Sequence, residues 1–109
     1  MKTEARLMQD CYLWLHNTYP KLHGLYFEIA NNAFSVQSGI KHKAIGRIAG
    51  VADSCLLIKK TVVFFEFKTE IGRQSLAQKN WQTLIESAGY KYFIIRLLSE
   101  FKNIICQLV

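Results

Sequence analysis

The sequence predicts a mixed α/β domain in which a central β-sheet is flanked by helices. Amphipathic stretches with apolar residues at helical spacing alternate with strand-length apolar runs, and short polar connections separate them. In chain order these segments predict one helix, three strands, a helix, a strand and a closing helix (αβββαβα). With 109 residues, half of them hydrophobic, the chain is expected to form a single domain over 1–109 with its own core.

The first helix is predicted over residues 3–17, with Thr3 as its N-cap and Pro20 beyond its end. Its apolar stripe, extended back one turn from Leu7, reaches Glu4, so this carboxylate is predicted to face the surface on which the helix packs. Alternatively, Glu4 is a first-turn residue that faces solvent and complements the helix dipole.

A strand is predicted over 25–30, followed by a long loop or irregular hairpin over 31–50 that is rich in Asn, Ser, Gly and Lys. The loop contains the densest basic cluster of the chain, made by Lys41, His42, Lys43 and Arg47. Such a cluster suits phosphate contact, and the alternative is a solvated loop in which His42 is an ordinary surface histidine.

The rest of the chain is predicted to contain strands over 51–58 and 61–68 joined at Lys59-Lys60, a polar loop over 69–74, a helix over 75–88 and a strand over 90–97. A closing helix is predicted to be capped by Ser99 and to run to Leu108. Gly89 is expected to end the helix that precedes it. The apolar face of the closing helix predicts either a homodimer interface or ordinary core packing, through Phe101, Ile104, Ile105 and Leu108.

Composition indicates a basic, reduced protein. The net charge of +6 and the pI near 9.4 favour a polyanionic partner, with nucleic acid the first candidate and an inert basic surface the alternative. Cys11, Cys55 and Cys106 lie among apolar neighbours without zinc-site spacing, which is typical of reduced core cysteines. No signal peptide or membrane-length apolar run is recognisable, so we expect a soluble cytoplasmic protein, in a bacterium or a phage-infected host.

Two charges interrupt the predicted strand over 61–68. Glu66 and Lys68 occupy one face of an otherwise apolar run, which a strand buried on both faces does not require for packing. If this strand and the preceding one form an antiparallel hairpin with an even-numbered loop, Asp53 lies directly opposite Glu66, with Cβ atoms about 4.5 to 5.5 Å apart, and Val51 lies opposite Lys68.

Two opposed carboxylates repel each other unless a cation lies between them. A Mg²⁺ ion takes one or two carboxylates together with waters and a substrate phosphate, so the pattern indicates a metal-dependent phosphodiesterase. The alternative is a structural ion-pair cluster in which Lys68 neutralises the acids. An odd-numbered loop at Lys59-Lys60 would instead move Asp53 off the face that carries Glu66.

These residues also form a recognisable pattern. Gly50-Val51-Ala52-Asp53, followed by Glu66-Phe67-Lys68, resembles the catalytic signature of the PD-(D/E)XK nuclease superfamily. The segments 72–81 and Ala88-Gly89-Tyr90 are similar to the Ser-x-x-Gln helix and the Gly-aromatic turn of its VRR-NUC (virus-type replication-repair nuclease) family. The resemblance covers nearly the whole chain. Ala52 stands where the superfamily often has a proline, a structural position that is not a metal ligand.

The resemblance implies a restriction-endonuclease-like core and Mg²⁺- or Mn²⁺-dependent hydrolysis of DNA. It implies that Asp53 and Glu66 bind the metal, that Glu4 is an outer acidic partner, and that Lys68 positions water or stabilises phosphate charge. Gln78 matches the glutamine of the family's helix, although Ser75-x-x-Gln78 is equally a capping box.

The resemblance further implies a homodimer that acts on branched DNA in replication, recombination or repair, as Holliday-junction resolvases do. The side chains predicted to contact DNA are Lys41, Lys43, Arg47, Arg73 and Lys79. Asn31 and Asn32 loosely match an asparagine-containing segment of the family, but turn residues are the favoured interpretation. The alternative functions are a non-catalytic nucleic-acid-binding module and a subunit of a repair complex that retains the nuclease fold.

Overall fold

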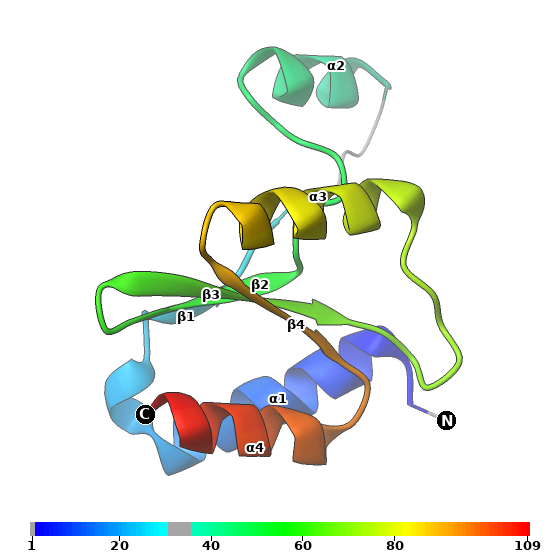
Figure 1. The fold of residues 1–109 in the computed structure, drawn as a ribbon. Coiled ribbons are helices and arrows are strands. Elements are labelled where there is room, and N and C mark those ends of the chain that lie inside the picture. Colours follow the sequence, from blue (N-terminus) through cyan, green and yellow to red (C-terminus); the bar gives the residue numbers. More distant parts are fainter. Residues whose placement is uncertain (1, 31–35) are drawn as a thin grey trace.

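A four-stranded mixed sheet lies at the centre of the domain, in the order β1-β2-β3-β4 (Figure 1). The computed structural model describes residues 2–30 and 36–109. In chain order the elements are α1 (Glu4–Thr18), the 3₁₀ turn η1 (Pro20–Leu22), β1 (Tyr26–Glu28), α2 (Val36–Ala44), β2 (Ser54–Ile58), β3 (Thr61–Phe67), α3 (Leu76–Ser87), β4 (Lys91–Ile95) and α4 (Leu98–Leu108). β1, β2 and β3 are antiparallel neighbours, whereas β4 runs parallel to β3 after the α3 crossover.

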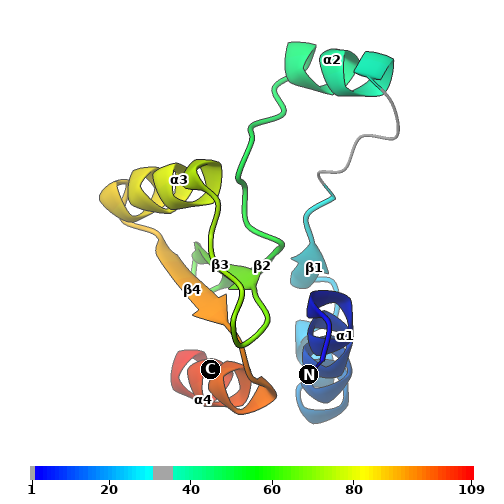
Figure 2. The same cartoon turned by 90° about the vertical axis from the view of Figure 1, so that its right-hand side faces the viewer.

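The helices divide between the two faces of the sheet. α1 and α4 lie side by side on one face, and α3 covers the other (Figures 1 and 2). The buried core is on the α1 and α4 side and consists of Leu7, Cys11, Leu15, Tyr26, Leu56, Val63, Phe65, Phe67, Ile95, Phe101 and Ile105. On the opposite face the ring of Phe64 packs edge-on against that of Trp81 in α3, with centroids 4.9 Å apart.

The predicted hairpin register is confirmed. Cys55 pairs with Phe64 and Leu57 with Val62, and the two-residue turn consists of Lys59 and Lys60. Both lysines have positive φ values, 50° and 64°, which are the left-handed conformations that a tight hairpin turn demands at both central positions. The even loop therefore sends the side chains of Val62, Phe64 and Glu66 to the α3 face, as the alternation requires.

The strands are shorter than predicted. β2 begins at Ser54 and β3 ends at Phe67, so the predicted pairing of Val51 with Lys68 does not occur in the ladder. The reason is local: the Asp53 carboxylate accepts a hydrogen bond from the Phe67 N–H at 2.8 Å. This bond replaces the next backbone hydrogen bond that the ladder between β2 and β3 would form. Lys68 instead extends the parallel pairing, donating its N–H to the Ile95 carbonyl at 3.0 Å.

A helix that the sequence pattern did not predict, α2, lies within the stretch expected to be irregular. The observed order is therefore αβαββαβα, with the additional 3₁₀ turn. α2 stands away from the sheet, beyond α3, and the connection from α2 to β2 is extended (Figures 1 and 2). Because it does not pack on the domain core, it lacks the broad apolar stripe by which amphipathic helices are recognised.

The helix ends agree with the predictions except at the closing helix. The Thr3 hydroxyl accepts from the Arg6 N–H at 3.1 Å and caps α1, while Gly89, at φ 93°, follows the last residues of α3. α4 begins earlier than predicted, with Leu97 at the cap position and Ser99 inside the helix. The Glu100 carboxylate accepts from the Arg96 and Leu97 N–H groups, which makes a serine cap unnecessary.

Core packing explains the apolar face of α4. Phe101 and Ile105 are fully buried in the core, as the packing alternative predicts, whereas Ile104 and Leu108 are only partly buried, and a dimer interface stays a prediction. Of the three free cysteines, Cys11 and Cys55 are buried as predicted, whereas Cys106 is exposed and lies 3.6 Å from the Tyr19 hydroxyl. Among the described helices, none is long and apolar enough to cross a membrane.

Candidate active site

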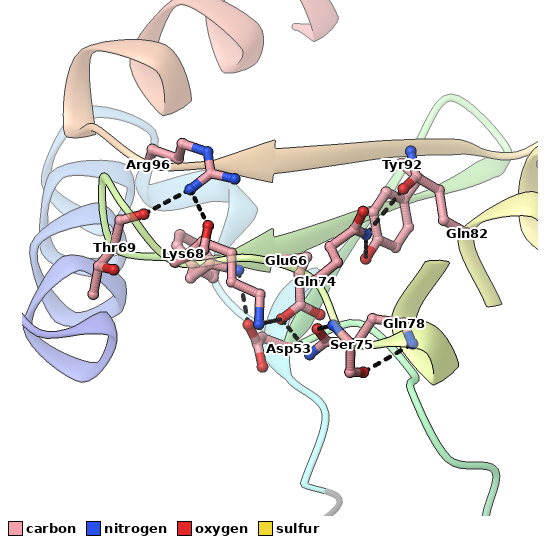
Figure 3. Close-up of polar contacts among 12 residues, drawn as sticks. Asp53, Glu66, Lys68, Thr69, Gln74, Ser75, Gln78, Gln82, Tyr92 and Arg96 are labelled. Carbon is pink, nitrogen blue, oxygen red and sulfur yellow. Dashed lines mark hydrogen bonds and ion pairs between the residues drawn. The ribbon is translucent and has the colours of Figure 1, made fainter. Parts of the chain in front are cut away.

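Asp53, Glu66 and Lys68 converge at the end of the sheet where β3 stops (Figure 3). Asp53 precedes β2 and is held by both neighbouring strands. Its carbonyl accepts from the Ile29 N–H, and its carboxylate oxygen Oδ2 accepts from the Phe67 N–H, each at 2.8 Å. The backbone of two strands thus fixes this carboxylate beside Glu66.

Glu66 is a buried carboxyl group with one unsatisfied oxygen. Its side chain is 1% exposed, and its Oε2 atom lies 3.1 Å from Gln78 Nε2 and 3.9 Å from Lys68 Nζ. Its Oε1 atom is the buried side-chain polar atom without a hydrogen-bond partner within residues 2–30 and 36–109. An unpaired buried oxygen is costly, so this atom is a candidate for contact with a ligand.

The surroundings of Glu66 favour its protonated form. Burial is the main cause that raises its pKa, to about 8, and the Asp53 carboxylate raises it further, both by its negative charge and by accepting a hydrogen bond from Glu66 when Glu66 is protonated. Lys68 acts in the opposite direction, and Glu4 adds a smaller repulsion. A divalent cation between the carboxylates would reverse this balance, because it stabilises both negative charges.

Gln78 combines the two roles that the sequence left open. Its Oε1 atom accepts from the Ser75 N–H at 2.8 Å, while the Ser75 hydroxyl accepts from the Gln78 N–H at 3.2 Å, which completes a capping box at the start of α3. Its Nε2 atom donates to Glu66 Oε2 at 3.1 Å. One amide group therefore fixes the start of α3 and orients the buried carboxylate.

Further polar residues, which the sequence patterns did not single out, hold the loop between β3 and α3. Arg96 Nη1 donates to the carbonyls of Thr69 and Gly72 at 2.7 and 2.6 Å. The signal that could have identified Arg96 is the one that identified Lys68, namely a charged residue at the end of an apolar strand.

A second network supports the α3 side of the loop. Gln74 Nε2 donates to Gln82 Oε1 at 2.9 Å and to the Tyr92 hydroxyl at 3.2 Å (Figure 3). Tyr92 is buried, and this burial, followed by the charge of Glu66, raises its pKa to about 12, so it remains a neutral hydroxyl.

The residues present suit a hard divalent cation. Asp53 and Glu66 supply carboxylate oxygens, one of which is buried without a partner, and Mg²⁺ needs only one or two carboxylates when waters and phosphate oxygens complete its shell. In the described part of the chain, no three His, Cys, Asp or Glu side chains form a metal-binding group. Glu4 is exposed on the first turn of α1, and it interacts with Glu66 only through its charge.

The predicted DNA-contacting residues lie around the α3 side of the molecule. Lys41 and Lys43 are exposed on α2, Arg47 follows that helix, and Arg73 and Lys79 are exposed before and within α3. His42 is also on α2 and is half-buried. Asn31 and Asn32 lie outside the described residues.

Comparison with known proteins identifies the fold. No family model matches this sequence, and no curated protein matches it. Among solved structures, a VRR_NUC domain protein superposes with a TM-score of 0.84 at 18% sequence identity, over 100% of this chain and 89% of the other. The predicted α/β class with a restriction-endonuclease-like core is thereby confirmed as a fold, with the additional helix α2 described above.

Proposed function

We propose that this protein is a Mg²⁺- or Mn²⁺-dependent nuclease that hydrolyses DNA phosphodiester bonds. The observation that carries the proposal is the buried, unpartnered Oε1 atom of Glu66, positioned next to Asp53 and Lys68 at the end of β3. The resemblance of the VRR_NUC domain fold to this chain supports the same activity. The structural ion-pair alternative rests on the 3.9 Å contact between Lys68 Nζ and Glu66 Oε2, which leaves Oε1 without a donor.

Each residue has a role that follows from its position. Asp53 and Glu66 would hold the metal, which when bound supplies an activated water and polarises the phosphoryl group. Lys68, a compact cation at the strand end, orients the attacking water or offsets charge that develops on the phosphate. Gln78 keeps the Glu66 carboxylate in place through its amide, and Glu4 contributes negative charge at the edge of the site.

Branched DNA is the proposed substrate, and a homodimer is the proposed active form. The net charge of +6 and the exposed lysines of α2 favour phosphate contacts over base reading, since one small domain offers little surface for reading bases. A two-fold dimer would place two sites on opposed strands of a junction. Because Phe101 and Ile105 are core residues, their side chains do not contribute to the interface of such a dimer.

The test is cleavage of a panel of labelled DNAs by the purified protein in Mg²⁺ or Mn²⁺. The panel contains four-way junctions, flaps, splayed arms, nicked duplexes and linear duplexes. We expect the wild-type protein to cut at least one branched substrate and Asp53→Asn and Lys68→Ala to lose the activity while they remain folded. Glu86→Gln in α3, which removes an exposed carboxylate away from the site, is the matched control and should cut normally.

Two results would contradict this function. Undiminished cleavage by Asp53→Asn would show that another site, or a contaminant, performs the reaction. Tight DNA binding by the wild-type protein without cleavage in either metal would instead support a non-catalytic binding module. Light scattering at micromolar concentration tests the proposed dimer separately.

A further inference from the structure

A small pocket adjoins the candidate site on the side away from Gln78. It has a volume of about 180 Å³ and lies where the start of α1, the loop after β3 and the start of α4 meet. Its polar walls are Lys2, Lys68, Glu70 and Arg96. Since Lys68 also contacts Glu66, the pocket and the proposed metal site share one side chain.

Cations dominate this pocket. Three of its four charged side chains are basic, and Glu70, the single acid among them, is exposed. Arg96 is fixed in place, because its Nη1 atom holds the carbonyls of Thr69 and Gly72. Those two bonds do not use Nε or Nη2, and a guanidinium has five donor hydrogens in a planar fork that matches phosphate oxygens.

Lys2 completes the cationic wall from α1. Its ammonium donates to Asp10 at 2.6 Å, which uses one of its three donor hydrogens. The Asp10 carboxylate also accepts from Arg6 at 3.0 Å, and these contacts lower its pKa, so it remains charged and keeps Lys2 close to the pocket. The site is therefore partly built before any ligand arrives.

The size of the pocket limits its ligand. A volume of about 180 Å³ is below the roughly 300 to 1,000 Å³ of pockets that hold whole small molecules, and it equals about six water molecules of liquid. A phosphate group with its ordered water fits, whereas a complete nucleotide does not. The three cations that line the pocket outnumber its one lining acid, Glu70, so the pocket favours an anionic ligand.

We propose that this pocket binds a phosphate group of the DNA strand that is being cut, next to the bond that is cleaved. The inference rests on the proposed nuclease function and adds to it a second point of strand recognition. The group is either a phosphomonoester at a DNA end or nick, or a phosphodiester within the strand. Both have the same oxygen chemistry, so their separation is a matter for experiment.

Binding in EDTA, where no cleavage occurs, tests the pocket directly. Fluorescence anisotropy compares nicked duplexes that carry a phosphate or a hydroxyl on the 5′ or the 3′ side of the nick. The variants are Lys2→Ala and Arg96→Gln, with Lys21→Ala, an exposed lysine of η1, as the charge-matched control. Thermal melts in inorganic phosphate, against chloride at equal ionic strength, provide a readout without DNA.

We expect Lys2→Ala to weaken DNA binding about fivefold to tenfold relative to Lys21→Ala. Inorganic phosphate should raise the melting temperature of the wild-type protein and of Lys21→Ala more than that of Lys2→Ala. If only DNA with a phosphate at the nick shows the loss, the ligand is a terminal phosphomonoester; an equal loss on all DNAs identifies an internal phosphodiester. Because Arg96→Gln also releases a loop, its binding is interpreted only after its melt shows a folded protein.

If Lys2→Ala binds DNA as tightly as Lys21→Ala does, and is stabilised equally by inorganic phosphate, the proposal that the pocket binds phosphate is wrong. That result alongside metal-dependent cleavage by the wild-type protein rejects the pocket and retains the nuclease function. The reverse result, a phosphate effect that depends on Lys2 in a protein that cuts no DNA, rejects the nuclease function and retains the pocket.

Discussion

Glu66 illustrates how a single buried residue couples stability to function. Its carboxyl group is enclosed by the sheet and α3, its neighbour Asp53 is acidic, and its pKa is raised to about 8. In the unfolded chain the same group titrates near 4.5. Between these values the native protein binds more protons than the unfolded chain, so its stability falls as the pH rises.

The resulting prediction concerns unfolding in EDTA. For the wild-type protein, the free energy of unfolding should decrease between pH 5 and pH 8 by up to about 1.4 kcal/mol per pH unit. In this range the unfolded chain has lost the Glu66 proton, so folding must either take a proton up again or bury the negative charge. Glu66→Gln, which is neutral at every pH, should flatten this dependence, and urea denaturation across the range measures it. Glu86→Gln is the control, and a Glu66→Gln curve that parallels the wild type would reject the assignment.

Gln78 allows the helix cap and the site to be separated. Gln78→Glu keeps an oxygen that accepts from the Ser75 N–H but loses the Nε2 donor to Glu66. We expect it to lower metal-dependent cleavage by about 10- to 100-fold, as the loss of an orienting partner of a metal ligand does. Cleavage at the wild-type rate by Gln78→Glu would show that the contact with Glu66 has no part in activity.

Ser75→Ala is the complementary variant. It removes the hydroxyl that accepts from the Gln78 N–H, which should cost about 1 kcal/mol of stability in chemical denaturation and leave cleavage within about twofold.

The site was predictable from sequence only where a pattern is local. Glu66 and Lys68 interrupt an apolar strand, and alternation with an even loop then places Asp53 opposite Glu66. Arg96 follows an apolar strand, as Lys68 does, but the carbonyls that it holds, those of Thr69 and Gly72, are remote in sequence, so its role required the observed fold. The two roles of Gln78 required the observed position of α3 against the sheet.

At the scale of elements, packing explains what the sequence patterns predicted and what they did not. Helices α1, α3 and α4 and the four strands pack against one another, so their apolar periodicity indicates them. α2 stands apart from this core, and its Ile40 side chain is 64% exposed, so this apolar residue is not packed against the described part of the domain. The apolar periodicity of the sequence therefore did not indicate this helix.

The chain segment that leads into β2 passes close to α3 at Gly50. At φ 83° this residue lies so close to α3 that a Cβ atom would overlap the backbone carbonyl of Ala77. Gly50→Ala should therefore displace α3, and with it Gln78, from the sheet. We expect a loss of stability clearly larger than that of Gly46→Ala, together with loss of metal-dependent cleavage.

Gly46→Ala is a matched control because Gly46 also has positive φ, 107°, but open space around it. Gly46→Ala should lower the free energy of unfolding by only about 1 to 2 kcal/mol, the usual cost of placing a residue with a side chain in the left-handed conformation. Equal melting temperatures for the two alanine variants would mean that α3 does not require this close approach.

At the scale of the whole molecule, α2 places positive charge on a helix that does not pack against the domain core. α2 lies beyond α3 (Figure 2) and carries the exposed Lys41 and Lys43. The core does not require these charges, so their basic character accords with the DNA partner proposed above.

The salt dependence of DNA binding tests this role of α2. Each phosphate contact contributes about −0.9 to the slope of log K against log salt concentration for duplex DNA. The double variant Lys41→Ala, Lys43→Ala should bind more weakly and have a slope shallower by up to about 1.8. The control, Lys21→Ala with Lys91→Ala, removes the same charge from exposed positions in η1 and β4 and should leave the slope nearly unchanged. If both doubles reduce the slope equally, the arm acts only through net charge and makes no phosphate contacts of its own.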